Sequence, residues 1–361
     1  MRRIDSLQGL RGWAIFFIIL WHLNPVFPGT LPRLGNLGVD FFLLLSGFLI
    51  ARKVDSSDTL SDFRSSAAYM YRKLKNSYFL YLFPAVPVFL LDVFAGPVKP
   101  SAPFWRLLTY CTLTQSWVPA SWIYWGVNSA GWFLPVILFC YLMTPVVRRV
   151  VRRFSALPVL IACLVLQIAA ELSAEYFLSE SLSDWLTYIC PAYRILDFTL
   201  GFCAWHLFCE RETGFSPCRA LHTSRPIRQS TCAIPCYFID LLYAMLVLIL
   251  AGLLLVRPVL LKYVLFHPFE ILLLLIVASE KSVLSNFLNR NRLIVRLGNL
   301  SRILFFTHVP FIRFTGMVWR RIFGPDLLFP QWVASLLVVF LSALIIDWLM
   351  KKYKKAVKKA P

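Results

Sequence analysis

Residues 6–22 read SLQGLRGWAIFFIILWH, and residues 38–50 read GVDFFLLLSGFLI. Both are apolar runs, and the first approaches the roughly 20 residues that a helix needs to cross a bilayer. Each run also contains ionisable side chains, which are Arg11, His22 and Asp40. Ionisable groups within a membrane are costly and therefore usually functional. These two stretches predict membrane helices that carry a functional site.

The rest of the chain repeats this pattern. Its 361 residues are 59% hydrophobic and 15% charged, whereas an average globular domain is nearer a quarter charged. We predict an all-α, polytopic transmembrane helical bundle with one membrane-embedded domain over residues 1–350 and a basic cytoplasmic tail over residues 351–361. Its ten expected spans are residues 12–27, 37–51, 78–95, 130–147, 155–172, 186–208, 233–256, 263–279, 297–313 and 327–349.

The net charge of +19 is carried in short basic blocks between the apolar runs. This pattern is typical of loops held against anionic lipid headgroups and not of a nucleic-acid groove. Excess Lys and Arg marks the cytoplasmic side, so we expect both termini to be cytoplasmic. We also expect the protein to lie in the plasma (inner) membrane. The blocks on that side are residues 2–3, 52–75, 148–153, 211–228, 281–296 and 351–359.

The nine cysteines do not suggest a disulfide framework, because most of them fall inside apolar runs. Four lie near two histidines, but their spacing matches no zinc pattern, so we expect no metal site. These residues are His206, Cys209, Cys218, His222, Cys232 and Cys236.

Arg11 and His22 share one helix face, because eleven residues complete almost three turns. They are separated along the axis by roughly 16 Å, at about 1.5 Å per residue. Arg binds phosphate through several donors and stays charged, and His can take a proton from a hydroxyl near neutral pH. This pair suits a donor with a phosphate end and a reactive acyl end. The alternative is a topology anchor at Arg11 and a headgroup contact at His22.

Asp40 needs a partner within the membrane, and it lies near the expected level of His22. A carboxylate that orients an imidazole is a common way to set its tautomer. In the same stretch, Ser46 and Gly47 are small residues of the kind that allows close helix approach.

Residues 6–22 and 38–50 resemble the two opening motifs of the acyltransferase-3 family, integral membrane enzymes that O-acylate sugars, lipids or small metabolites. The resemblance covers nearly the whole chain, and the Arg-x10-His motif is fairly specific. Three later stretches agree, which are Trp132-Phe133-Leu134 with Tyr141-Leu142 and Pro145, then Arg194 with Asp197, Phe198 and Gly201, and Leu297-Gly298-Asn299-Leu300-Ser301 with His308 and Pro310. The chain departs from the family pattern at Gln8, Asn76 and Ile137, where Asp, Arg and Glu are usual.

The resemblance implies an enzyme that takes an acyl group, most often acetyl, from cytosolic acyl-CoA and binds no permanent cofactor. The acceptor would be a hydroxyl of a glycan, lipid or small metabolite at or across the membrane. The implied catalytic residues are His22, Asp40 and His308, and the implied donor-binding residues are Arg11, Ser46, Arg72, Lys73 and Lys75. For His308 the alternative is a buried imidazole bonded to a carbonyl.

Two other functional classes stay open. A secondary transporter or flippase would also bury charges at mid-depth, but no repeat of two halves is visible. A catalytically silent relative that serves as a binding subunit is suggested by Ile137. The tryptophans of residues 104–128 predict an interfacial aromatic belt or, alternatively, a platform for a sugar-like acceptor.

Overall fold

The structure is a computed structural model that describes residues 4–23, 32–57, 59–95, 102–213, 264–324 and 328–359. These residues form helices and no strands, so the all-α prediction is confirmed. The helices are α1 (Asp5–His22), α2 (Pro32–Ser57), α3 (Phe63–Leu82), α4 (Ala85–Ala95), α5 (Ala102–Cys111), α6 (Ser121–Tyr124), α7 (Phe133–Leu142), α8 (Thr144–Phe154), α9 (Ala156–Phe177), α10 (Glu180–Asp184), α11 (Pro191–Thr213), α14 (His267–Ala278), α15 (Val283–Arg290), α16 (Arg292–Phe323) and α17 (Leu328–Lys359).

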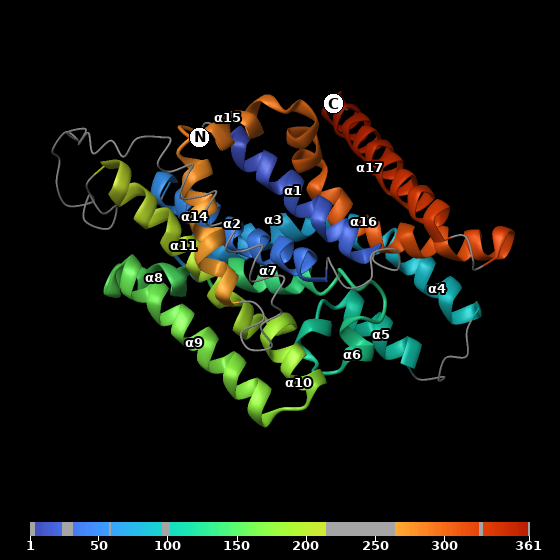
Figure 1. Cartoon of the computed structure of the whole chain (residues 1–361), viewed down its shortest axis with the longest axis horizontal. Coiled ribbons are helices and arrows are strands. Elements are labelled where there is room, and N and C mark those ends of the chain that lie inside the picture. The colour runs from blue at the N-terminus through green and yellow to red at the C-terminus, as the bar shows by residue number, and fades with distance from the viewer. Residues whose placement is uncertain are drawn as a thin grey trace.

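Six long helices form the body of the bundle. α1 packs between α2 and α16, α2 packs on α11, and α9 and α17 cover the outer sides of α11 and α16. Figure 1 shows α9 and α17 along opposite edges, with α1, α2 and α16 between them. Of the three described stretches that are long and apolar enough to span a membrane, those in α9 and α17 are the most apolar and the least buried by protein, as lipid-facing helices should be.

Glycines set the two closest helix crossings. A Cβ atom at Gly298 of α16 would overlap the Gln8 carbonyl oxygen of α1. A Cβ atom at Gly201 of α11 would likewise overlap the Leu44 carbonyl oxygen of α2. Because small residues let helix backbones approach in a membrane, these crossings fix how α1 sits on α16 and how α2 sits on α11.

Among the described residues, three helical stretches are long and apolar enough to span a membrane, or up to five if two bent helix pairs each count as one span. They make the chain an integral membrane protein, but they do not confirm ten spans. The expected span 233–256 lies outside the described residues, as do Cys218, His222, Cys232 and Cys236 of the cysteine-histidine cluster. The stretches are Phe63–Leu91, Ala156–Phe177 and Phe329–Ala356, and the bent pairs are α7 with α8 and α14 with α15.

The tryptophan-rich segment folds as short pieces, α5 and α6 with a 3-10 turn between them. Trp105, Trp117, Trp122 and Trp125 are each between 38% and 49% exposed. This arrangement suits a headgroup belt and a sugar platform equally, so the two interpretations stay open.

The orientation of the bundle remains a prediction. The start of α1 and the end of α17 lie at the same end of the bundle, whereas the turn between α9 and α10 lies at the opposite end (Figure 1). We expect a reporter fused after Lys359 to be cytoplasmic and one inserted at Ser179 to face outward, because basic residues favour the cytoplasm. Protease accessibility or a paired phosphatase and fluorescence reporter measures this. Two reporters on the same side would overturn the topology.

Candidate active site

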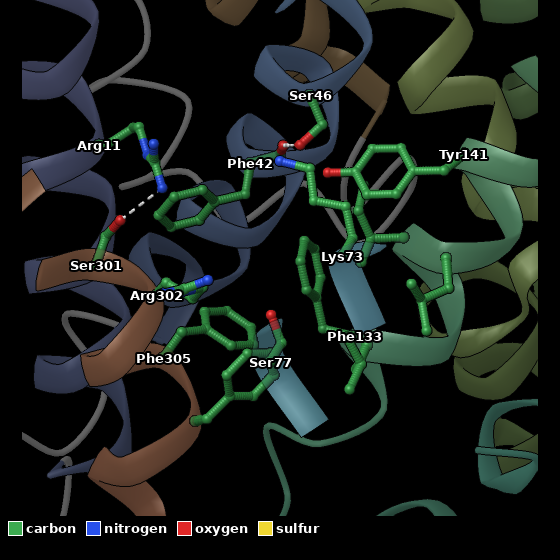
Figure 2. A pocket seen from close by; sticks show the side chains of 14 residues that line it. Arg11, Phe42, Ser46, Lys73, Ser77, Phe133, Tyr141, Ser301, Arg302 and Phe305 are labelled. Atoms are coloured by element: carbon green, nitrogen blue, oxygen red, sulfur yellow. Dashed lines mark hydrogen bonds between the residues drawn. The ribbon is translucent and has the colours of Figure 1, made fainter. Parts of the chain in front are cut away.

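A cavity of about 180 Å³ lies between α1, α2, α3, α7 and α16. Figure 2 shows that side chains from all five helices point into it. Three of them are cations, which are Arg11, Lys73 and Arg302. Because three positive groups face one small cavity, it is suited to an anionic ligand such as a phosphate.

Arg11 is held in place by α16. Its guanidinium donates to the Ser301 hydroxyl at 2.9 Å and to the Gln8 side-chain oxygen at 3.3 Å. Ser301 precedes Arg302, so one turn of α16 both orients one cation and supplies another. Nothing in the sequence around Arg11 indicates this partner, which comes from 290 residues away.

The basic residues of α3 divide into two groups. All three of Arg72, Lys73 and Lys75 are exposed, but only Lys73 lines the cavity. Around the nearby Tyr69 ring, the Lys53 and Lys73 amino groups lie 4.1 Å and 5.2 Å from the centroid, and the Arg72 guanidinium carbon lies 5.9 Å from it. Lys53, Arg72 and Lys73 thus surround one aromatic ring on the first half of α3.

Hydroxyl groups line the cavity beside the cations. Ser46 donates to the Phe42 carbonyl oxygen at 2.7 Å, so its oxygen remains available as an acceptor toward the cavity. Ser77 of α3 and Tyr141 of α7 contribute two further hydroxyls. Sequence reasoning assigned Ser46 to the donor site but gave Ser77 no role, because an isolated serine in an apolar run carries no motif.

His22 and His308 meet at the junction of α1 and α16. Their ring centroids are 4.7 Å apart, and the His308 Nε2 atom lies 3.3 Å from the His22 Nδ1 atom. His308 is fully buried, and its Nδ1 atom lies 2.8 Å from the Leu304 carbonyl oxygen. The His22 Nδ1 atom also lies 3.0 Å from the Ile18 carbonyl oxygen.

These contacts define the tautomers. Because a carbonyl oxygen can only accept, the Nδ1 atom of each neutral ring must carry its proton. The Nε2 atom of His308 is then an acceptor for the His22 Nδ1–H group, and the Nε2 atom of His22 is left as a base. Such a base can take a proton from a hydroxyl within reach.

Phe305 stands between the cavity and the histidine pair. It lines the cavity, and its ring centroid lies 6.2 Å from that of His308 on the same helix. The Phe133 and Phe42 rings flank it at 4.8 Å and 6.0 Å. Neither His22 nor His308 lines the cavity, and Phe305 is a lining residue that contacts His308.

The outer loop is tied to α16 next to His308. Pro310 has no N–H group, so it leaves the Phe306 carbonyl oxygen without its helical donor. The Asn128 side-chain amide donates to that oxygen at 3.1 Å, and Arg313 donates to the Val127 carbonyl oxygen at 3.1 Å. The loop between α6 and α7 is thereby held against α16 on both sides of His308.

The prediction that Asp40 orients His22 is wrong. Asp40 is completely buried and pairs with Arg194 of α11, which also contacts Asp197 at 2.8 Å. His267 of α14 continues the network, with its Nε2 atom 3.1 Å from Asp197 and its Nδ1 atom 3.1 Å from Glu270. Asp40 turns toward α11 because the Arg194 guanidinium is the compensating charge that a buried carboxylate requires. In place of Asp40, His308 contacts His22.

Comparison with known proteins shows which protein family this chain matches. Residues 4–350 match the family model described as "Acyltransferase domain". The acyltransferase MdmB of Streptomyces mycarofaciens is 29% identical over 224 residues, which cover 55% of this chain and 56% of that protein. The regulator of hypoxia-inducible factor 1 of Caenorhabditis elegans is 28% identical over 159 residues, which cover 42% of this chain and 30% of that protein. The chain thus matches about half or less of the length of these relatives, and no solved structure matches it significantly.

Proposed function

We propose that this chain, which belongs to the acyltransferase-3 family of membrane proteins, transfers an acyl group from cytosolic acyl-CoA to an acceptor hydroxyl. The acceptor would be a glycan, a lipid or a small metabolite at or across the plasma membrane. MdmB, which is named an acyltransferase, supports the reaction class. The donor is proposed from the cations of the site, and the acceptor classes are those that the family implies.

The observation that carries the proposal is the double contact between α1 and α16. At one level Ser301 binds Arg11, and about two turns further along α16 His308 contacts His22. The two helices therefore run in the same direction with a phosphate-binding level and a base level on one axis. Arg11 and His22 are roughly 16 Å apart along that axis. The pantetheine arm of acyl-CoA would join the two levels.

In the proposed reaction, His22 Nε2 takes the proton of the acceptor hydroxyl while the hydroxyl oxygen attacks the thioester carbonyl carbon. The carbon–sulfur bond then breaks, and the imidazolium returns its proton to the departing thiolate. The products are an ester and free CoA. His308 Nε2 accepts the His22 Nδ1–H bond throughout, so it holds the ring and stabilises the imidazolium, a role that a carboxylate fills in other triads.

A transporter is the second candidate, because the Asp40, Arg194, Asp197, His267 and Glu270 network places charge deep among the helices. Like the histidine pair, the network does not line the cavity. Transfer of label from acyl-CoA to an acceptor separates the candidates, since a transporter or a silent relative would release no CoA.

Replacement of Arg11 tests the donor end. We expect Arg11→Ala to weaken binding of CoA by about tenfold or more, because a hydrogen bond to a charged group contributes about 1.5–3 kcal/mol. Arg11→Lys should restore part of the affinity, since it keeps the charge and loses the planar fork. Titration of the purified proteins with CoA measures this. Arg149→Ala, an exposed cation of α8 outside the cavity, is the control. Unchanged affinity in Arg11→Ala would return Arg11 to the role of a topology anchor.

A further inference from the structure

The cavity changes character along its depth. Its cationic level holds Arg11, Lys73 and Arg302. One turn further along α16, Phe305 and Phe306 replace the cation, and His308 follows directly behind them. The apolar level of the cavity therefore lies between the phosphate-binding cations and the histidine pair.

That level is formed by aromatic and aliphatic side chains from α2, α7 and α16. Phe305 contacts both Phe42 and Phe133, and Ile137 lines the cavity one turn along α7 from Phe133, on the side of Tyr141. The remaining apolar members are Leu134, Leu138 and Phe306. Such a surface does not hydrogen-bond a polar ligand, and burial of hydrocarbon against it is favourable.

We propose that this apolar level is an acyl-chain subsite and that the protein prefers donors with chains longer than acetyl, such as butyryl or hexanoyl. The inference rests on the proposed function, because the occupant is the acyl end of a donor whose phosphates lie at Arg11. The pantetheine arm reaches His22 past Phe305, and the acyl chain folds back from the thioester against the apolar wall. An acetyl group can bury only one methyl group against that wall.

The size of the effect follows from the burial of hydrocarbon. Each methylene that moves from water into an apolar site multiplies the binding affinity by about four. A hexanoyl chain has four methylenes more than acetyl, so even partial burial gives at least a tenfold preference. Ile137 is the most informative wall residue, because its neighbour Val136 is fully buried on the same helix and does not line the cavity.

The test measures binding of CoA, acetyl-CoA and hexanoyl-CoA to the full chain in lipid nanodiscs, with empty nanodiscs subtracted. We expect hexanoyl-CoA to bind at least tenfold more tightly than CoA and acetyl-CoA to bind within a few-fold of CoA. Ile137→Asn should lower hexanoyl-CoA affinity about tenfold and change CoA affinity less than twofold. Val136→Ala, the matched control, and Ile137→Leu should keep the hexanoyl preference.

The outcomes are distinguishable. If the unaltered protein binds CoA, acetyl-CoA and hexanoyl-CoA with equal affinity, the acyl-chain subsite is overturned and the proposed function still stands. Failure of all three to bind would overturn both. Equal loss of CoA and hexanoyl-CoA in Ile137→Asn, with both retained in Ile137→Leu, would assign Ile137 to the fold and contradict the subsite.

Discussion

His22→Ala should lower the rate of acyl transfer by about 10²–10⁴-fold, the usual contribution of a positioned general base. His22 is the histidine of the pair whose Nε2 atom is left as a base once its Nδ1 atom bonds to Ile18 and His308. The protein should still fold, because α1 is held by its glycine crossing and by Arg11. Single-turnover transfer from labelled acyl-CoA, with CoA binding measured in parallel, is the readout. Normal turnover by a folded His22→Ala protein would contradict the catalytic role.

His308 provides the internal control for that prediction. His308→Ala should lose less activity than His22→Ala, because it removes the group that holds the base and leaves the base itself. The double variant should be no slower than His22→Ala alone, since residues that act as one unit are not additive. Fully additive losses would show that His308 acts independently of His22.

Arg194→Leu should destabilise the folded protein by about 3–5 kcal/mol, because it leaves the buried carboxylates Asp40 and Asp197 without their cation. The expected loss is in stability and yield, since Arg194 does not line the cavity. Unfolding in mixed detergent measures the change. Arg149→Leu removes an exposed Arg of α8 and should change stability by less than about 0.5 kcal/mol. Equal stability of the two variants would show that the network does not hold α2 to α11.

Local pattern predicted the helices and placed Arg11 and His22 on one face, because both follow from the 3.6-residue repeat. It also led to the family, which the match over residues 4–350 confirms. The local sequence pattern could not identify which side chains pair between helices that are distant in sequence. Asp40 was assigned to His22 from depth alone, yet its partner is Arg194, which is 154 residues away and provides the full positive charge that a buried carboxylate needs.

The number of spans was harder to predict for a physical reason. Helices that face protein on several sides can carry polar residues, and among the described residues α9 and α17 contain long uninterrupted apolar stretches, whereas α1, α2, α11 and α16 do not. Two expected spans, residues 130–147 and 263–279, contain α7 and α14, and the next helix is bent away by 55° at α8 and by 72° at α15. Hydropathy did not predict these bends, because it does not depend on the direction of the helix axis.

In the proposed route, acyl-CoA from the cytosol reaches His22 deep in the membrane. The most direct test of this route uses sealed vesicles of known orientation. Labelled acyl-CoA is too highly charged to cross a bilayer, so the side of its addition is controlled. We expect transfer when acyl-CoA is supplied at the cytoplasmic face and a membrane-impermeant fraction of cell-surface glycans and metabolites at the other. No transfer should occur with the sides exchanged or with His22→Ala. Transfer with both substrates confined to the cytoplasmic face would contradict the route from Arg11 through the bilayer to His22.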